Sequence, residues 1–184
     1  MCLIVHDRKT IKIMSIVSTI NRIHNESRTF LYVRDVSLLH HHNCELDDVD
    51  RIVHIYAEIY PDCLDRGSDI TEHTARCVSD EGALGDTPFQ LFSKRLGGSG
   101  HHFDFFPLNE KIDMTTWKEN ETKVYEHVKE GGDRYALMAY SFEYDNQNEH
   151  QICRPIKIYY YFALFDLGDP VGEEMEGMIY NQVM

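Results

Sequence analysis

The sequence predicts an α+β protein built around a mainly antiparallel sheet. Two observations carry this prediction. Several stretches are rich in β-branched and aromatic residues and are bounded by turn residues, which is the pattern of strands. One stretch alone repeats apolar residues at helical spacing. Strands that gather around one helix, instead of alternating with helices, favour antiparallel pairing.

The chain of 184 residues suits one domain, and it contains no internal repeat and no low-complexity linker. Residues 51–166 are expected to form the main domain. Residues 1–50 should supply N-terminal strands and a loop that belong to this domain or are appended to it. Residues 167–184 form an acidic tail, for which a short helix and disorder are both open alternatives.

The N-terminal part contains two short strand candidates, Ile11–Val17 and Thr29–Leu39. The tract His40–Cys44 follows them and contains three consecutive histidines. Adjacent residues on a strand point to opposite faces, so these histidines are poorly placed to share a metal ion. We therefore expect a loop of solvated histidines.

The stretch Arg51–Tyr60 alternates apolar and polar residues, and Pro61 closes it, so it predicts a strand. The polar stretch Asp62–Thr87 reads as a long irregular connection. Gln90–Leu96 is a short strand candidate, stopped by the glycine-rich turn Gly97–Gly100.

The next segment carries the most regular helical pattern of the chain. Asp113 is placed to cap its N-terminus, and the glycine pair at 131–132 should end it. The stripe that repeats at spacings of four, three and four consists of Trp117, Glu121, Val124 and Val128.

Two more strands are expected after the helix, at Arg134–Glu143 and Pro155–Asp166. The second is apolar or aromatic at nearly every position. Such a continuous run is typical of a central strand that is packed on both faces.

The composition narrows the possible functions. A formal charge of −13 argues against a general nucleic-acid binder, although a local basic patch stays compatible with it. The acidity also fits docking to another protein. Five scattered cysteines without a Cys-x-x-Cys pair favour reduced thiols over disulfides or structural zinc. No apolar run is long enough to span a membrane and the first residues do not resemble a signal peptide, so we expect a soluble, intracellular protein, cytoplasmic by default.

Two carboxylates stand out in the helical segment. Glu121 lies on the apolar stripe, where a carboxylate is costly unless it is paired or hydrogen-bonded. One interpretation is a structural bond to a backbone amide or to an arginine such as Arg134 or Arg154. Asp113 has an equally plain interpretation as a helix cap.

The wider sequence context gives both residues a second interpretation. The strand candidate Gln90–Leu96 leads to the turn Gly97–Gly100, then to the segment Phe103–Asn109, and Asp113, Trp117 and Glu121 follow at spacings of four. This order resembles the DNA/RNA non-specific endonuclease family of ββα-metal nucleases, in particular its toxin-associated branch. Arg154-Pro155 and the aromatic strand after it are similar to the closing strand of that family.

The resemblance implies a ββα-metal motif, in which a His-Me finger-like hairpin is followed by a helix, within an endonuclease-like domain over residues 51–166. Gln90 stands where the family has its catalytic histidine, and an amide cannot take a proton from water. Asp113 replaces the metal-binding asparagine. The resemblance implies that Asp113 could bind Mg²⁺ or Mn²⁺ directly while Glu121 holds a metal-bound water.

Substitutes for the missing base are His101 and His102, which lie just after the glycine turn, and more weakly His73. For His101 and His102 we favour the interpretation of ordinary histidines in a surface loop. The candidates for contacts with a phosphate backbone are Lys94, Arg95 and Lys118, together with Lys111. Solvated strand and helix faces explain these basic residues equally well.

Three hypotheses follow. We prefer a degenerate nuclease scaffold, inactive or weakly active, that acts as a binding or regulatory module toward another protein. The second hypothesis is an active metal-dependent nuclease that cleaves DNA or RNA with a substitute base. The third is an unrelated α+β protein-interaction domain.

Overall fold

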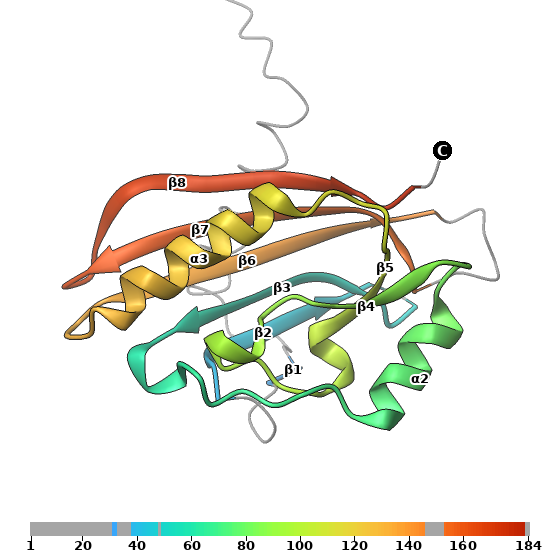
Figure 1. Ribbon diagram of the computed structural model, residues 1–184, viewed down its shortest axis with the longest axis horizontal. Helices are drawn as coiled ribbons and strands as arrows, with labels where there is room; N and C mark the ends of the chain where they lie inside the picture. Colours follow the sequence, from blue (N-terminus) through green and yellow to red (C-terminus); the bar gives the residue numbers. More distant parts are fainter. Residues whose placement is uncertain (1–30, 33–37, 48, 146–152, 183–184) are drawn as a thin grey trace, which may run out of the picture.

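The computed structural model describes residues 31–32, 38–47, 49–145 and 153–182 (Figure 1). The expected strand Ile11–Val17 lies outside these residues. Of the expected strand Thr29–Leu39, only Leu31–Tyr32 is seen as a strand, and most of its other residues also lie outside the described ranges.

The predicted α+β class with a mainly antiparallel sheet is confirmed. The larger sheet has the strand order β1-β2-β3-β6-β7-β8, and every neighbouring pair is antiparallel. Its strands are β1 (Leu31–Tyr32), β2 (His40–Leu46), β3 (Ile52–Ile59), β6 (Tyr135–Tyr144), β7 (Pro155–Asp166) and β8 (Asp169–Tyr180).

A separate two-stranded hairpin precedes the long helix. Its strands are β4 (Asp86–Gln90) and β5 (Phe105–Asn109), paired antiparallel, and α3 (Thr115–Lys129) follows them. In Figure 1, α3 runs across one face of the sheet, in front of β6 and β7, and the hairpin lies beside it. A second helix, α2 (Glu72–Glu81), packs against the hairpin.

Strand β7 shows why its sequence is almost wholly apolar. Ile158, Tyr160 and Phe162 enter the main core on the face that carries α3. Tyr159 and Tyr161 point the other way, into a smaller apolar cluster with Tyr56 and Leu137. The expectation of a strand packed on both faces is therefore confirmed.

The helix α3 also follows its sequence pattern. Its buried residues include Trp117, Glu121, Val124 and Val128, which are the expected stripe. These side chains fix the helix on the sheet, because burying each large apolar side chain contributes about 1.5–3 kcal/mol. Neither this helix nor α2 is long and apolar enough to cross a bilayer.

Four expectations about elements were wrong. The connection Asp62–Thr87 contains a 3-10 turn, η1 (Pro61–Cys63), and the helix α2, whose first turn is capped by the Thr71 hydroxyl accepting from the Thr74 amide at 3.1 Å. The strand expected at Gln90–Leu96 instead ends at Gln90, and η2 (Lys94–Leu96) follows.

The acidic tail is the third correction, because residues 169–180 form the edge strand β8. Its acidic side chains face solvent, while Met175 and Ile179 enter the core. Gly177 lies opposite Tyr160, and a Cβ at that glycine would come within 2.2 Å of the Tyr160 hydroxyl. Charges on an edge strand also discourage pairing with other chains.

The histidine tract is part of β2 instead of a solvated loop. The register against β3 shifts between His40 and Asn43, and His41 adopts a left-handed backbone with φ of 48°. This bulge breaks the usual alternation of faces. As a result His42 is buried, whereas His40 and His41 remain exposed.

Candidate functional site

The segment from the β4–β5 hairpin through α3 contains most of the residues that the sequence singled out as candidate site residues. Gln90 ends β4 opposite Phe105, and the Leu91 amide still donates to the Asp104 carbonyl at 2.8 Å. Between them the chain passes through η2, the glycine turn and η3 (His102–Asp104). Gly98 lies so close to this segment that a Cβ there would come within 1.6 Å of the Phe92 carbonyl oxygen.

Gln90 closes this loop through its side chain. Its Nε2 donates to the Ser99 carbonyl oxygen at 3.0 Å, so the amide ties the end of β4 to the glycine turn. Because a carboxamide nitrogen has no basic lone pair, the group acts here as a donor and cannot accept a proton from water.

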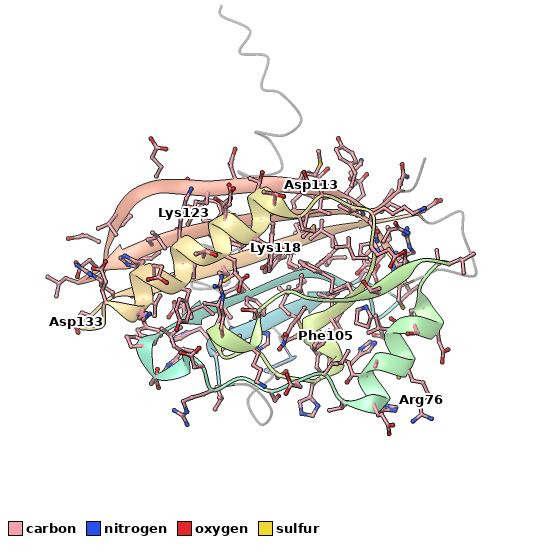
Figure 2. All side chains as sticks on the ribbon, in the orientation of Figure 1. Arg76, Phe105, Asp113, Lys118, Lys123 and Asp133 are labelled. Carbon is pink, nitrogen blue, oxygen red and sulfur yellow. The ribbon has the colours of Figure 1, made fainter. Side chains whose placement is uncertain are left out.

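Asp113 lies at the start of α3 and is exposed (Figure 2). Its Oδ1 accepts from the Thr115 hydroxyl at 2.6 Å and from the Thr115 amide at 2.9 Å. These two bonds lower the pKa of Asp113, and the bond from the Thr115 hydroxyl has the larger effect. The helix begins at Thr115, and Met114 occupies the capping position. Asp113, the residue before Met114, therefore accepts a hydrogen bond from one of the free amides of the first turn.

Glu121 is buried on the inner face of α3. Its Oε1 accepts from the Ser93 hydroxyl and from Nε of Arg95 at 3.2 Å. The sequence suggested Arg134 or Arg154 as partners, but Arg134 contacts Asp166 and Arg154 contacts Asp86. The Glu121 carboxylate is thus engaged by the loop that connects β4 and β5.

A buried tyrosine borders this carboxylate. The Tyr140 hydroxyl donates to the Leu91 carbonyl at 2.5 Å. Burial, and secondly the charge of Glu121, raise the pKa of Tyr140 well above its usual range. Tyr140 therefore stays protonated and acts as a fixed donor to the loop.

In the described part of the chain, Asp113 and Glu121 do not form a group of three neighbouring His, Cys, Asp or Glu ligand atoms. Among the residues that the structure describes, three ligand atoms of the His/Cys/Asp/Glu type come within 4.8 Å of one another at His40, Asp62 and Cys63. Neither Asp113 nor Glu121 belongs to this group.

The two nearest candidate substitute bases differ in their surroundings, and the weaker candidate, His73, lies on α2 instead of in a loop. Nε2 of His102 lies 3.2 Å from Oε1 of Glu81 on α2, and this hydrogen bond raises the pKa of His102. His102 is therefore held by α2. His101 is exposed on the loop, where its backbone amide donates to the Ser99 hydroxyl at 3.3 Å.

Two of the basic residues expected to contact phosphates are paired with carboxylates. Nζ of Lys94 lies 2.7 Å from Asp69, and Arg95 bonds Glu121 and the Thr122 hydroxyl. Lys118 is exposed on α3 (Figure 2), and its charge contributes to the lowered pKa of Asp113. The exposed Lys111 precedes this helix.

Sequence reasoning missed a buried His42–Asp104 pair beneath the hairpin. Nε2 of His42 lies 3.3 Å from Oδ1 of Asp104, and Oδ2 of Asp104 accepts from the Ser99 amide and hydroxyl. Burial lowers the pKa of His42, although the charge of Asp104 acts in the opposite direction. Burial raises the pKa of Asp104, although His42 and the hydrogen bonds from Ser99 act in the opposite direction. The available signal was an aspartate between two phenylalanines, which is unusual for a solvated acid.

Together, the antiparallel sheet, the β4–β5 hairpin and α3, which packs on one face of the sheet, make up an α+β fold that can be compared with solved structures. Among solved structures, the chain is similar to a protein described as an extracellular endonuclease, with a TM-score of 0.51, 10% identity and coverage of 88% of this chain and 86% of that one. It is also similar to the Sda1 nuclease with bound zinc ion, with a TM-score of 0.47, 13% identity and coverage of 80% and 76%.

No family model matches the sequence, and no curated protein matches it. At these identities the likeness to the endonuclease is one of fold. The chemistry of this chain has to be argued from its own residues.

Proposed function

We propose that this protein is a degenerate nuclease whose scaffold serves binding or regulation, with another protein as its partner. One observation carries the proposal. The position where the resemblance calls for a general base holds Gln90, whose amide donates to the Ser99 carbonyl. Loss of a general base alone typically lowers the rate by about 10²–10⁴-fold.

The surroundings of Glu121 give further support. Its Oε1 accepts from Ser93 and from Arg95, so a cation already neutralises part of the charge that would hold a metal-bound water. Asp113 is exposed and engaged by Thr115. Binding of Mg²⁺ or Mn²⁺ by these two residues stays a prediction.

The choice of a protein partner over nucleic acid follows from charge. The chain has a formal charge of −13, and Lys94 and Arg95 are paired with Asp69 and Glu121. Electrostatic attraction to phosphates needs unpaired, clustered cations. Free thiols at four described cysteines support the intracellular location that belongs to this proposal: Cys44, Cys63, Cys77 and Cys153.

A cleavage assay tests the proposal directly. The protein is incubated with plasmid DNA and with RNA in Mg²⁺ or Mn²⁺, with EDTA in parallel. We expect no metal-dependent cleavage above the background of a mock purification. Cleavage that EDTA stops and Glu121→Ala abolishes would overturn the proposal in favour of an active nuclease, and His101→Gln and His102→Gln would then identify the substitute base.

The variant Gln90→His restores the residue type that the family resemblance expects. Recovery of metal-dependent cleavage in this variant, and none in the matched control Gln90→Asn, would show that the scaffold lacks chiefly its base. Circular dichroism of both variants checks that the hairpin still folds without the bond to Ser99.

Nucleic-acid binding is tested separately by fluorescence anisotropy with labelled DNA and RNA at low salt. We expect no measurable affinity. A strong affinity that falls steeply with added salt would reveal a phosphate site and contradict the protein-partner part of the proposal.

A further inference from the structure

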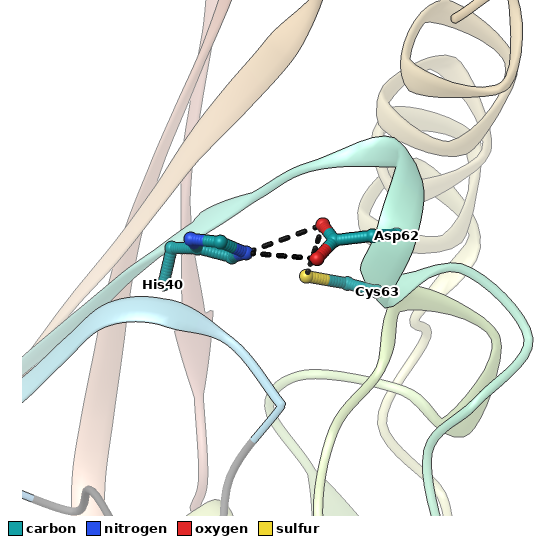
Figure 3. A group of neighbouring side chains, drawn as sticks. All are labelled: His40, Asp62 and Cys63. Carbon is teal, nitrogen blue, oxygen red and sulfur yellow. Dashed lines mark hydrogen bonds and ion pairs between the residues drawn. The ribbon is translucent and has the colours of Figure 1, made fainter.

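His40, Asp62 and Cys63 lie together at the end of the sheet where β2 begins and β3 ends. His40 is the first residue of β2, and Asp62 and Cys63 lie in η1, directly after Pro61. The bulge at His41 changes the faces along β2, and the His40 ring packs on the Tyr60 ring at 4.6 Å between centroids. Figure 3 shows the three side chains pointing toward one another.

The distances between their ligand atoms are close to those around a tetrahedral metal ion. Nε2 of His40 lies 3.2 and 3.3 Å from the two oxygens of Asp62, and Sγ of Cys63 lies 3.8 Å from Oδ1. All three atoms fall within 4.8 Å of one another. Metal–ligand bonds of about 2.0–2.3 Å at tetrahedral angles place ligand atoms about 3.3–3.6 Å apart. Small side-chain rotations would therefore suffice.

We propose that His40, Asp62 and Cys63 form a binding site for a zinc-type divalent cation. The donor set is imidazole, carboxylate and thiolate, which suits borderline-soft ions such as Zn²⁺ or Co²⁺ and is poorly suited to Mg²⁺. Cys63 is buried, whereas His40 and Asp62 are exposed, so the ion can enter from solvent. Water or the Leu38 carbonyl oxygen, 3.3 Å from Sγ, can supply the fourth ligand.

A cation here would brace the loop that follows η1. The Asp65 amide donates to the Arg95 carbonyl at 2.8 Å, and the Gly67 amide donates to the Lys94 carbonyl at 3.1 Å. Gly97 lies against Cys63 so closely that a Cβ would come within 2.7 Å of the Cys63 carbonyl oxygen. The site is thus next to the loop that holds Glu121, yet it uses none of the residues of the proposed degenerate nuclease site.

A competing thiol–imidazole pair within the described residues serves as a control. His73 and Cys77 lie one turn apart on α2, with Nε2 and Sγ separated by 3.7 Å. This pair lacks a third ligand in the described residues, so it should bind a cation more weakly than the three-residue site.

Titration of the metal-free full-length protein with Co²⁺ tests the proposal. A thiolate ligand produces a sulfur-to-cobalt charge-transfer band, which a cation held only by Asp113 and Glu121 cannot produce. We expect one equivalent to give this band together with the intense visible absorption of tetrahedral Co²⁺, and Zn²⁺ to displace it. Cys63→Ser should abolish the band, while Cys77→Ser should leave it unchanged.

Asp62→Asn and His40→Gln change exposed side chains and give a second readout if Cys63→Ser fails to fold. Each should weaken Zn²⁺ binding by more than about 10-fold in competition with a chromophoric chelator, because loss of a ligand exceeds the usual effect of an outer-shell change. The Zn²⁺-dependent rise in melting temperature should shrink in parallel. Absence of a charge-transfer band in the wild type, or its loss in Cys77→Ser alone, would overturn the proposal.

Discussion

The buried carboxylate of Asp86 forms an ion pair with Arg154, which comes much later in the sequence. Nε and Nη2 of Arg154 lie 2.5 and 3.0 Å from its two oxygens, and the two side chains are 8% and 3% exposed. Arg154 also donates to the Asn181 carbonyl at 2.6 Å. One buried cluster thus joins β4, the entry to β7 and the residue after β8.

The first prediction concerns this cluster. Asp86→Asn should lower the free energy of unfolding at neutral pH by about 3–5 kcal/mol, because it leaves the Arg154 charge buried without its partner. Urea denaturation measures the change, with the exposed Asp133→Asn as a matched control. A loss as small as that of the control would mean that solvent reaches the arginine.

The same variant has a defined pH dependence. Burial by itself raises the pKa of Asp86, but the hydrogen bonds from Arg154 and the Ala83 amide outweigh it, so the net pKa is lowered. Its stabilisation is therefore present above the ordinary value of 3.8 and is lost as the pH falls through the folded-state value. The gap between wild type and Asp86→Asn should narrow in acid.

At the scale of elements, the hairpin depends on a glycine that lets two backbone segments touch. A Cβ at Gly98 would come within 1.6 Å of the Phe92 carbonyl oxygen and 3.2 Å of Nε2 of Gln90. Gly132, after α3, has open space around it but a φ of 72°. The two glycines are therefore required for different reasons.

The second prediction compares these positions. Gly98→Ala should destabilise the protein by about 3 kcal/mol or more, since backbone atoms must move to admit the methyl group. Gly132→Ala should cost only about 1–2 kcal/mol, the strain of a left-handed alanine. Thermal and urea unfolding of both variants measure the two losses of stability. Equal losses would mean that the glycine turn is not rigid.

The third prediction concerns the contact between α2 and the loop of the hairpin. The hydrogen bond to Glu81 raises the pKa of His102, so the pair stabilises the fold below the ordinary histidine value of 6.5 and loses this effect as the pH rises through the folded-state value. His102→Gln should therefore lower stability in mild acid, by less than about 1 kcal/mol for such an exposed pair, and change little in mild alkali.

The control for this effect is His101→Gln, an exposed neighbour with no carboxylate bond of this kind among the described contacts. Unfolding free energies are compared at both pH values. A loss in His102→Gln that grows toward alkali would reverse the expected sign and contradict the assignment.

At the scale of the whole molecule, the charge of −13 sets the response to salt. Net charge far from zero destabilises a compact state by self-repulsion. The fourth prediction is that unfolding free energy rises as KCl increases from about 10 mM to about 150 mM, because the screening length falls from about 30 Å to about 8 Å. A fall over this range would mean that specific ion pairs such as Asp47–Arg51 outweigh the repulsion.

Part of this architecture was predictable because the relevant interactions are local. The strands β3, β6 and β7 and the helix α3 each follow from periodicity within their own residues. Helix α2 was missed because it is short and polar, with only Thr74 and Val78 buried. Strand β8 was missed because an acidic edge strand carries apolar residues only on its inner face, which gives a weak sequence pattern.

The candidate site divides in the same way. The sequence by itself determined that Asp113 would engage the start of α3 and that Glu121 would lie on the buried stripe, since both depend on helical spacing. Only the tertiary structure decided that Arg95 and Ser93 hold Glu121, that Gln90 bonds Ser99, and that His40 meets Cys63. Those contacts depend on strand register, a bulge and loop path, which are set by distant partners and leave no local pattern.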